Sequence, residues 1–129
     1  RLGSSVIVLH KQRKSGTETE VTRIVGDVRD RACLIVDDMI STGGTLARSI
    51  EALLSAGARP DITIAATHGL FVAGARAKLS HESVRAIFVT DTVATQETDW
   101  PQLRVVSIAP LIATAIQRFK ANESIGDLV

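Results

Sequence analysis

The hydrophobic positions of this 129-residue chain fall into short apolar runs separated by polar segments. Runs that are apolar throughout and rich in β-branched residues are typical of buried strands. We therefore predict strands over residues 6–9, 32–36, 62–66, 84–89 and 103–108, with a weaker alternation at 21–25. Residues 11–20 are polar and show no apolar period, so we expect them to form an exposed, mobile loop.

Apolar residues at helical spacing predict helices between and after the later strands. The first spans 45–56 with Gly57 as its C-cap, the second spans 71–79, and the third spans 110–120. We expect the apolar residues of the third helix to face inward, namely Leu111, Ile112, Ala115, Ile116 and Phe119. Alternating strands and helices predict a single α/β domain over 1–129, whose mostly parallel sheet is flanked by helices on both faces.

The charge balance makes any anion binding a local matter. Fifteen Lys and Arg against 14 Asp and Glu leave a formal net charge of +1, so the chain exerts no general attraction on nucleic acid or membranes. Aromatic residues are 3% of the chain and Tyr is absent, which disfavours a base-stacking surface. No apolar stretch approaches the ~20 residues that cross a bilayer, and no signal peptide is visible. We expect a soluble, cytoplasmic domain.

The strongest chemical signal lies where the strand over 32–36 ends. Asp37 and Asp38 follow that strand, and a short loop then leads into the first helix through Ser41, Thr42, Gly43, Gly44 and Thr45. Backbone N–H groups, hydroxyls and the positive end of a helix dipole suit a phosphate dianion, and glycines let the backbone approach it closely. The two carboxylates would repel a phosphate but can accept hydrogen bonds from vicinal hydroxyls. A site for a phosphate at one end and for a diol at the other predicts a pentose phosphate as the ligand.

A plain strand-to-helix turn with a Ser or Thr N-cap is the alternative interpretation of this loop. The acidic pair in front of the loop disfavours that alternative. Two better-known phosphate motifs are absent, because no G-x-G-x-x-G follows a strand and no P-loop lysine is present.

At these residues the chain resembles a known family. Residues 36–46 resemble the phosphoribosyl-diphosphate binding motif of the type I phosphoribosyltransferase fold. Residues 25–28, 66–69, 89–92 and 106–111 resemble stretches of the C-terminal domain of the ribose-phosphate diphosphokinase family. Many bacterial members carry Asp in place of Ser41. The resemblance implies that this domain is the C-terminal half of a two-domain synthetase.

The resemblance also changes the interpretation of Lys11 and Arg13. On the residues alone, such charges at a strand end are usually solvated. Family members carry Lys-Arg-Arg here, on a loop that folds over the reacting phosphates, and in this chain Gln12 replaces the middle residue. The resemblance implies that Lys11 and Arg13 are catalytic, because the charge on the transferring diphosphoryl group must be neutralised. It also implies that Arg13 contacts ribose 5-phosphate.

The implied reaction transfers the β,γ-diphosphoryl group of ATP to O1 of ribose 5-phosphate, giving 5-phosphoribosyl 1-diphosphate and AMP. Mg²⁺ is implied as the counter-ion of nucleotide and substrate, with Asp37 placed to touch it and no firm protein metal site. The family also implies a homo-oligomer, and a 129-residue chain that is inactive without its N-terminal domain. Two alternatives are a phosphoribosyltransferase that consumes 5-phosphoribosyl 1-diphosphate and a non-catalytic regulatory subunit.

Three further residues stand at the ends of predicted strands. His68, Asp91 and Thr92 are placed to line the same site. For His68 we favour a core or loop position over a site role, and for Asp91 and Thr92 a turn fits equally well.

Overall fold

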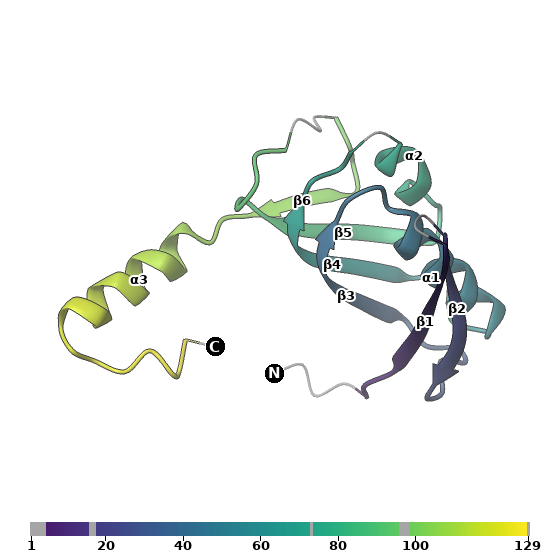
Figure 1. Ribbon diagram of the computed structural model, residues 1–129, viewed down its shortest axis with the longest axis horizontal. Coiled ribbons are helices and arrows are strands. Elements are labelled where there is room, and N and C mark those ends of the chain that lie inside the picture. The colour runs from purple at the N-terminus through teal and green to yellow at the C-terminus, as the bar shows by residue number, and fades with distance from the viewer. Residues whose placement is uncertain (1–4, 16–17, 73, 96–98, 129) are drawn as a thin grey trace.

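The structure is a computed structural model that describes residues 5–15, 18–72, 74–95 and 99–128, with residues 10–15 and 18–23 described by their backbone alone. Strands and helices alternate along most of the chain (Figure 1). The elements are, in order, β1 Val8–Ser15, β2 Glu18–Val25, β3 Cys33–Ile40, α1 Gly44–Ser55, β4 Ile62–Gly69, α2 Ala75–Leu79, β5 Val84–Thr90, β6 Leu103–Val106 and α3 Ala109–Lys120. No helix in this described part is long and apolar enough to cross a membrane.

Four parallel strands form the main sheet in the order β3-β4-β5-β6. The register aligns Ile35 of β3 with Ile64 of β4 and Ile87 of β5. These three isoleucines are buried, and they join the core side chains of α1 and α2 in one cluster. The predicted α/β class, with a parallel sheet flanked by helices, is confirmed.

The opposite face of the sheet is uncovered in the described chain. Leu34, Val36 and Phe88 alternate with the buried isoleucines, and their exposed fractions are 45%, 72% and 39%. The strands therefore show the alternation of a half-covered sheet, although their apolar runs resemble strands that are buried on both sides. Cover by helices, predicted on both faces, is found on one face.

Two antiparallel strands, β1 and β2, replace the loop that we predicted for residues 11–20, of which 16–17 lie outside the described residues. Backbone pairing joins Lys11 to Val21 and Arg13 to Thr19. The prediction was wrong because an antiparallel ladder is held by backbone hydrogen bonds, and a ribbon outside the main sheet needs no apolar period. Such a ribbon is marginal alone; here β2 lies against α1 (Figure 1).

Several predicted boundaries move. Strand β3 continues through the acidic pair to Ile40, and β6 ends at Val106. The predicted helix over 71–79 shrinks to α2, because Phe71 has a φ of 45° and Gly74 a φ of 82°. Neither residue can belong to a right-handed helix with that backbone.

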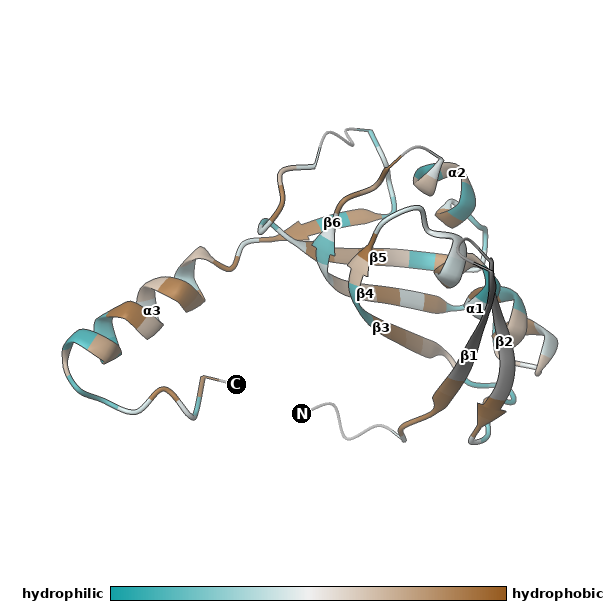
Figure 2. Cartoon of the chain, viewed as in Figure 1, coloured by the Kyte–Doolittle hydropathy of each residue, from teal (hydrophilic) through white to brown (hydrophobic). Residues whose placement is uncertain are grey.

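Helix α3 extends away from the sheet (Figure 1). Its prediction as a helix is confirmed, but the inward orientation of its apolar residues is wrong, since none of its residues is buried. Figure 2 shows apolar positions along this helix, which stands apart from the sheet. The exposed fractions of Leu111, Ile112, Ile116 and Phe119 are 44%, 48%, 55% and 80%.

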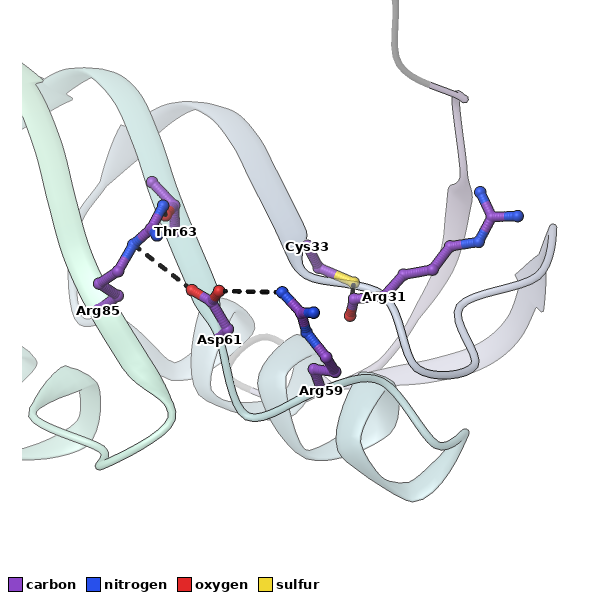
Figure 3. A network of polar contacts seen from close by, with 6 residues as sticks. All are labelled: Arg31, Cys33, Arg59, Asp61, Thr63 and Arg85. Carbon is purple, nitrogen blue, oxygen red and sulfur yellow. Dashed lines mark hydrogen bonds and ion pairs between the residues drawn. The ribbon is translucent and has the colours of Figure 1, made fainter.

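Two ion pairs lie near the amino ends of the parallel strands (Figure 3). Asp61 lies between Arg59 and Arg85, with nitrogen–oxygen distances of 3.4 Å to each. The Sγ of Cys33 donates to the carbonyl of Arg31, and burial raises the pKa of this thiol. Asp61 thus pairs with two of the arginines at this edge.

Candidate functional site

A cavity of about 510 Å³ lies where β3 ends and α1 begins. Its lining is continuous in sequence, from Asp37 to Leu46. Strand β3 supplies the two carboxylates, and the turn between the strand and the helix supplies the loop. The structure therefore brings together all the residues predicted to bind the sugar phosphate except Arg13, namely Asp37, Asp38, Ser41, Thr42, Gly43, Gly44 and Thr45.

Gly43 is the steric pivot of this loop. It is buried, it is the N-cap of α1, and it has a left-handed φ of 71°. A Cβ at this position would lie 3.0 Å from the Cγ of Leu79, a fully buried residue of α2. Both the backbone and the neighbour therefore require glycine. At Gly44, a Cβ would meet only Thr42 Oγ1, at an ordinary 3.6 Å.

The first turn of α1 offers N–H donors to the cavity. The intrahelical ladder begins at the Ala47 N–H, which donates to the Gly43 carbonyl at 2.9 Å. The N–H groups of Gly44, Thr45 and Leu46 precede that bond and have no partner within the helix. No side-chain cap is present at the N-cap, and Thr42 Oγ1 accepts from the Gly44 N–H at a long 3.5 Å. The turn thus presents donors and the positive end of a helix dipole, as an anion requires.

The acidic pair occupies the strand end of the same cavity. Asp37 is half-buried and Asp38 is exposed. The N–H of Asp38 donates to Asp37 Oδ1 at 3.0 Å, which restrains the Asp37 carboxylate. Among the described residues, no three or more His, Cys, Asp or Glu side chains gather as a metal site. The cavity therefore combines hydrogen-bond acceptors at one end with donors at the other.

The structure describes only the backbone of the two predicted catalytic residues. The backbones of Lys11 and Arg13 lie in β1, as the hairpin pairing shows. Their side chains lie outside the described residues. Their role, and the contact of Arg13 with the substrate, remain predictions.

A threonine and histidine cluster lies beside the cavity at the ends of β4 and β5. The register places His68 next to Met39 of β3, and His68 Nδ1 lies 2.8 Å from Thr92 Oγ1. The hydroxyl of Thr90 donates to the Thr67 carbonyl at 2.7 Å. His68 and Thr92 thus stand at the same edge as the acidic pair, held by each other, and neither lines the cavity.

Asp91 has a different place. Its Oδ1 accepts from the Ile108 N–H at 2.9 Å, at the junction between β6 and α3. Hydrogen bonds from the Ser107 hydroxyl and from the Ile108 N–H lower the pKa of this carboxyl. Asp91 thus links the end of β5 to the start of α3, and it is not among the residues that line the cavity.

Sequence analysis missed one residue that contacts the loop. Lys78 of α2 donates from its Nζ to the Thr42 carbonyl at 3.2 Å. The two residues are far apart in the chain, and an exposed lysine on a short helix carries no signal of its own. The pairing of β3 with β4 is the feature that could have indicated it, since α2 directly follows β4.

Comparison with known proteins agrees with this geometry. The protein named ribose-phosphate pyrophosphokinase from Brucella melitensis is 37% identical over 130 residues, which cover 99% of this chain and 42% of the relative. The protein of that name from Mycobacterium leprae is 40% identical, over 98% of this chain and 39% of the relative. This chain therefore spans about two fifths of the length of these curated relatives.

A solved structure agrees as well. Phosphoribosylpyrophosphate synthetase from Mycobacterium smegmatis matches with a TM-score of 0.70 and 39% identity, over 84% of this chain and 35% of that one. This match confirms the predicted type I phosphoribosyltransferase-like fold. The family model described as phosphoribosyl synthetase-associated domain matches residues 5–129. The chain belongs to the phosphoribosyl synthetase-associated domain family.

Proposed function

We propose that this chain is the ribose-5-phosphate-binding domain of a ribose-phosphate diphosphokinase. The whole enzyme transfers the β,γ-diphosphoryl group of ATP to O1 of ribose 5-phosphate, giving 5-phosphoribosyl 1-diphosphate and AMP. The observation that carries the proposal is the cavity lined by residues Asp37 to Leu46, with carboxylates at one end and a helix N-terminus at the other. The names of the relatives support the same activity.

Each end of the cavity has a distinct task in this proposal. The N–H groups around Gly43 and Gly44 hold the 5-phosphate at the start of α1. Asp37 and Asp38 accept hydrogen bonds from the 2- and 3-hydroxyls, so the sugar is fixed at both ends. A sugar held in this way presents O1 in one orientation, which reduces the entropic part of the barrier. Lys11 and Arg13 neutralise charge on the transferring group.

Mg²⁺ fits the donor set of the acidic pair. A Mg²⁺ ion is usually held by one or two carboxylates together with water and substrate phosphates. The half-buried Asp37 and the exposed Asp38 provide that number of carboxylates at the strand end of the cavity. The ion supplies charge neutralisation to the nucleotide and the substrate.

A second domain completes the enzyme in this proposal. The open sheet face around Val36 and the apolar face of α3 around Phe119 are exposed by 72% and 80%. Exposed apolar side chains of this kind favour an interface, and the relatives are more than twice as long as this chain. The chain alone therefore binds ribose 5-phosphate but forms no AMP from ATP.

Calorimetric titration tests the proposal. Ribose 5-phosphate with Mg²⁺ is titrated into the chain and into Asp37→Asn, and inorganic phosphate serves as the control for unspecific anion binding. We expect saturable binding that exceeds that of phosphate and that the substitution weakens about tenfold, since it removes one charge-assisted hydrogen bond. Equal affinity for ribose 5-phosphate and phosphate would contradict the proposal.

A further inference from the structure

The carbonyl groups of the phosphate loop are held one after another by donors outside the cavity. The Ile40 carbonyl accepts from the N–H groups of Leu70 and Phe71, at 2.9 and 3.1 Å. The Ser41 carbonyl accepts from the Val72 N–H at 3.1 Å. The segment between β4 and α2 therefore orients the last carbonyl of β3 and the first carbonyl of the loop through its backbone.

The next carbonyl is held by a side chain. Thr42 O accepts from the charged Nζ of Lys78 at 3.2 Å. A trans peptide unit is planar, so the carbonyl oxygen and the following N–H point in opposite directions. The bond that draws the Thr42 carbonyl toward α2 thus turns the Gly43 N–H the other way.

The cavity lies on the side of the loop to which the Gly43 N–H points. The lining consists of residues 37–46, and no residue of α2 takes part in it. Leu79 and Ala75 of α2 press against the back of the loop, where a Cβ on Gly43 would meet them at 3.0 and 3.4 Å. The Thr42 carbonyl therefore points to the back of the loop, where α2 lies, and the Gly43 N–H points to the front, where the cavity lies.

We infer that Lys78 is a positioning residue for the phosphate end of the site: its bond to Thr42 O orients the Gly43 N–H toward the substrate phosphate. The inference rests on the proposed function. Lys78 is exposed and lies behind the loop, so it acts through the loop backbone. Its charge also leaves the Thr42 carbonyl less able to repel an anion, since the ammonium partly cancels the negative end of that peptide dipole.

Packing alone does not explain the lysine. The buried residues of α2 are Ala75 and Leu79, and these two hold the helix against the loop. Lys78→Met keeps the length of the side chain and removes only the charge and the donor. Lys78→Arg keeps both, so it should restore the function of the lysine.

The experiment measures phosphate binding and the Gly43 amide together. Ribose 5-phosphate is titrated into the wild-type chain, Lys78→Met and Lys78→Arg, by calorimetry and by amide NMR. We expect Lys78→Met to weaken binding about tenfold and Lys78→Arg to stay within about threefold of the wild type, as for loss and retention of one charge-assisted hydrogen bond. The substrate-induced shift of the Gly43 amide should shrink in Lys78→Met and return in Lys78→Arg.

Lys120→Met is the matched control, because Lys120 is also exposed and lies at the far end of α3. We expect it to keep the wild-type affinity and the wild-type Gly43 shift. If Lys78→Met also keeps both, the inference fails while the proposed function stands. If the wild-type chain binds ribose 5-phosphate no better than inorganic phosphate, the proposed function fails first and the inference falls with it.

Discussion

Helices α1 and α3 have the same length and similar amphipathic patterns, but opposite surroundings. Each has 12 residues. Helix α1 buries Leu46, Ile50 and Leu53 against the sheet, whereas α3 buries no residue. An apolar stripe therefore predicts that a helix has a face to cover, and it contains no information about which surface covers that face.

The largest expected effect contrasts one isoleucine from each helix. Ile50 is 1% exposed and Ile116 is 55% exposed. We expect Ile50→Ala to lower the free energy of unfolding by about 2–5 kcal/mol, because it leaves a cavity in the core. Ile116→Ala should change it by less than about 1 kcal/mol, as at other surface positions. Urea unfolding of both variants measures the difference, and equal losses would mean that α3 is packed in solution.

The next effect concerns how α1 begins. Gly43→Ala places a Cβ 3.0 Å from Leu79 Cγ at a φ of 71°, so we expect a loss of about 1–2 kcal/mol in stability from the left-handed backbone alone. We also expect loss of ribose 5-phosphate binding, since the loop must move away from α2. Unfolding and calorimetry measure the two effects.

Gly44→Ala is the control for that variant, because its Cβ would meet only Thr42 Oγ1 at 3.6 Å. Stability should be kept in this control. Similar destabilisation by both substitutions would show that the wedge against Leu79 does not explain Gly43.

These contrasts also show what could be predicted from the sequence. The strands around Ile35, Ile64 and Ile87 were predictable because a core needs apolar runs, and the loop after Asp38 was predictable because few residue types can cradle a phosphate. Each strand and the loop are indicated by residues within a short stretch of chain. Local chemistry of this kind is visible without a structure.

The features that the sequence did not reveal depend on partners far away in the chain. The hairpin at Lys11 is held by backbone pairing, which leaves no hydrophobic period. The contact of Lys78 with Thr42 joins two elements through the sheet. The exposed face around Phe119 depends on what lies beyond the helix itself. Such relations are properties of the fold, and residue patterns alone do not contain them.

A smaller effect is expected from substitutions on the apolar face of α3, which should change self-association more than folding stability. Replacing Ile116 and Phe119 together by Ser should alter the free energy of unfolding by no more than about 0.5 kcal/mol per site, because both residues are exposed. The same change should reduce concentration-dependent self-association of the chain, since exposed apolar patches associate. Light scattering over a concentration series measures this. Unchanged scattering would place the association elsewhere.

The smallest effect concerns how α3 begins. Helix α1 begins at Gly43, which is packed so closely against Leu79 that a Cβ would lie 3.0 Å from its Cγ. Helix α3 begins instead after an exposed hydrogen bond, from the Ile108 N–H to Asp91 Oδ1 at 2.9 Å. The Ser107 hydroxyl and the Ile108 N–H lower the pKa of Asp91 below its ordinary value of 3.8. The ionised carboxylate therefore stabilises the junction above that ordinary pKa, and the contribution is lost as the pH falls through the lower, folded pKa.

An NMR titration of the Asp91 carboxyl and the Ile108 amide measures this tether. We expect both signals to move together below pH 3.8, at the pKa of the folded carboxyl. In Asp91→Asn the amide oxygen can still accept, but no proton is taken up in this range, so the Ile108 signal should lose its pH dependence. The effect on stability is small because water screens an exposed charge. A carboxyl that titrates at or above its ordinary pKa would mean that α3 leaves β6 without this restraint, and that the contrast with the wedged start of α1 is greater still.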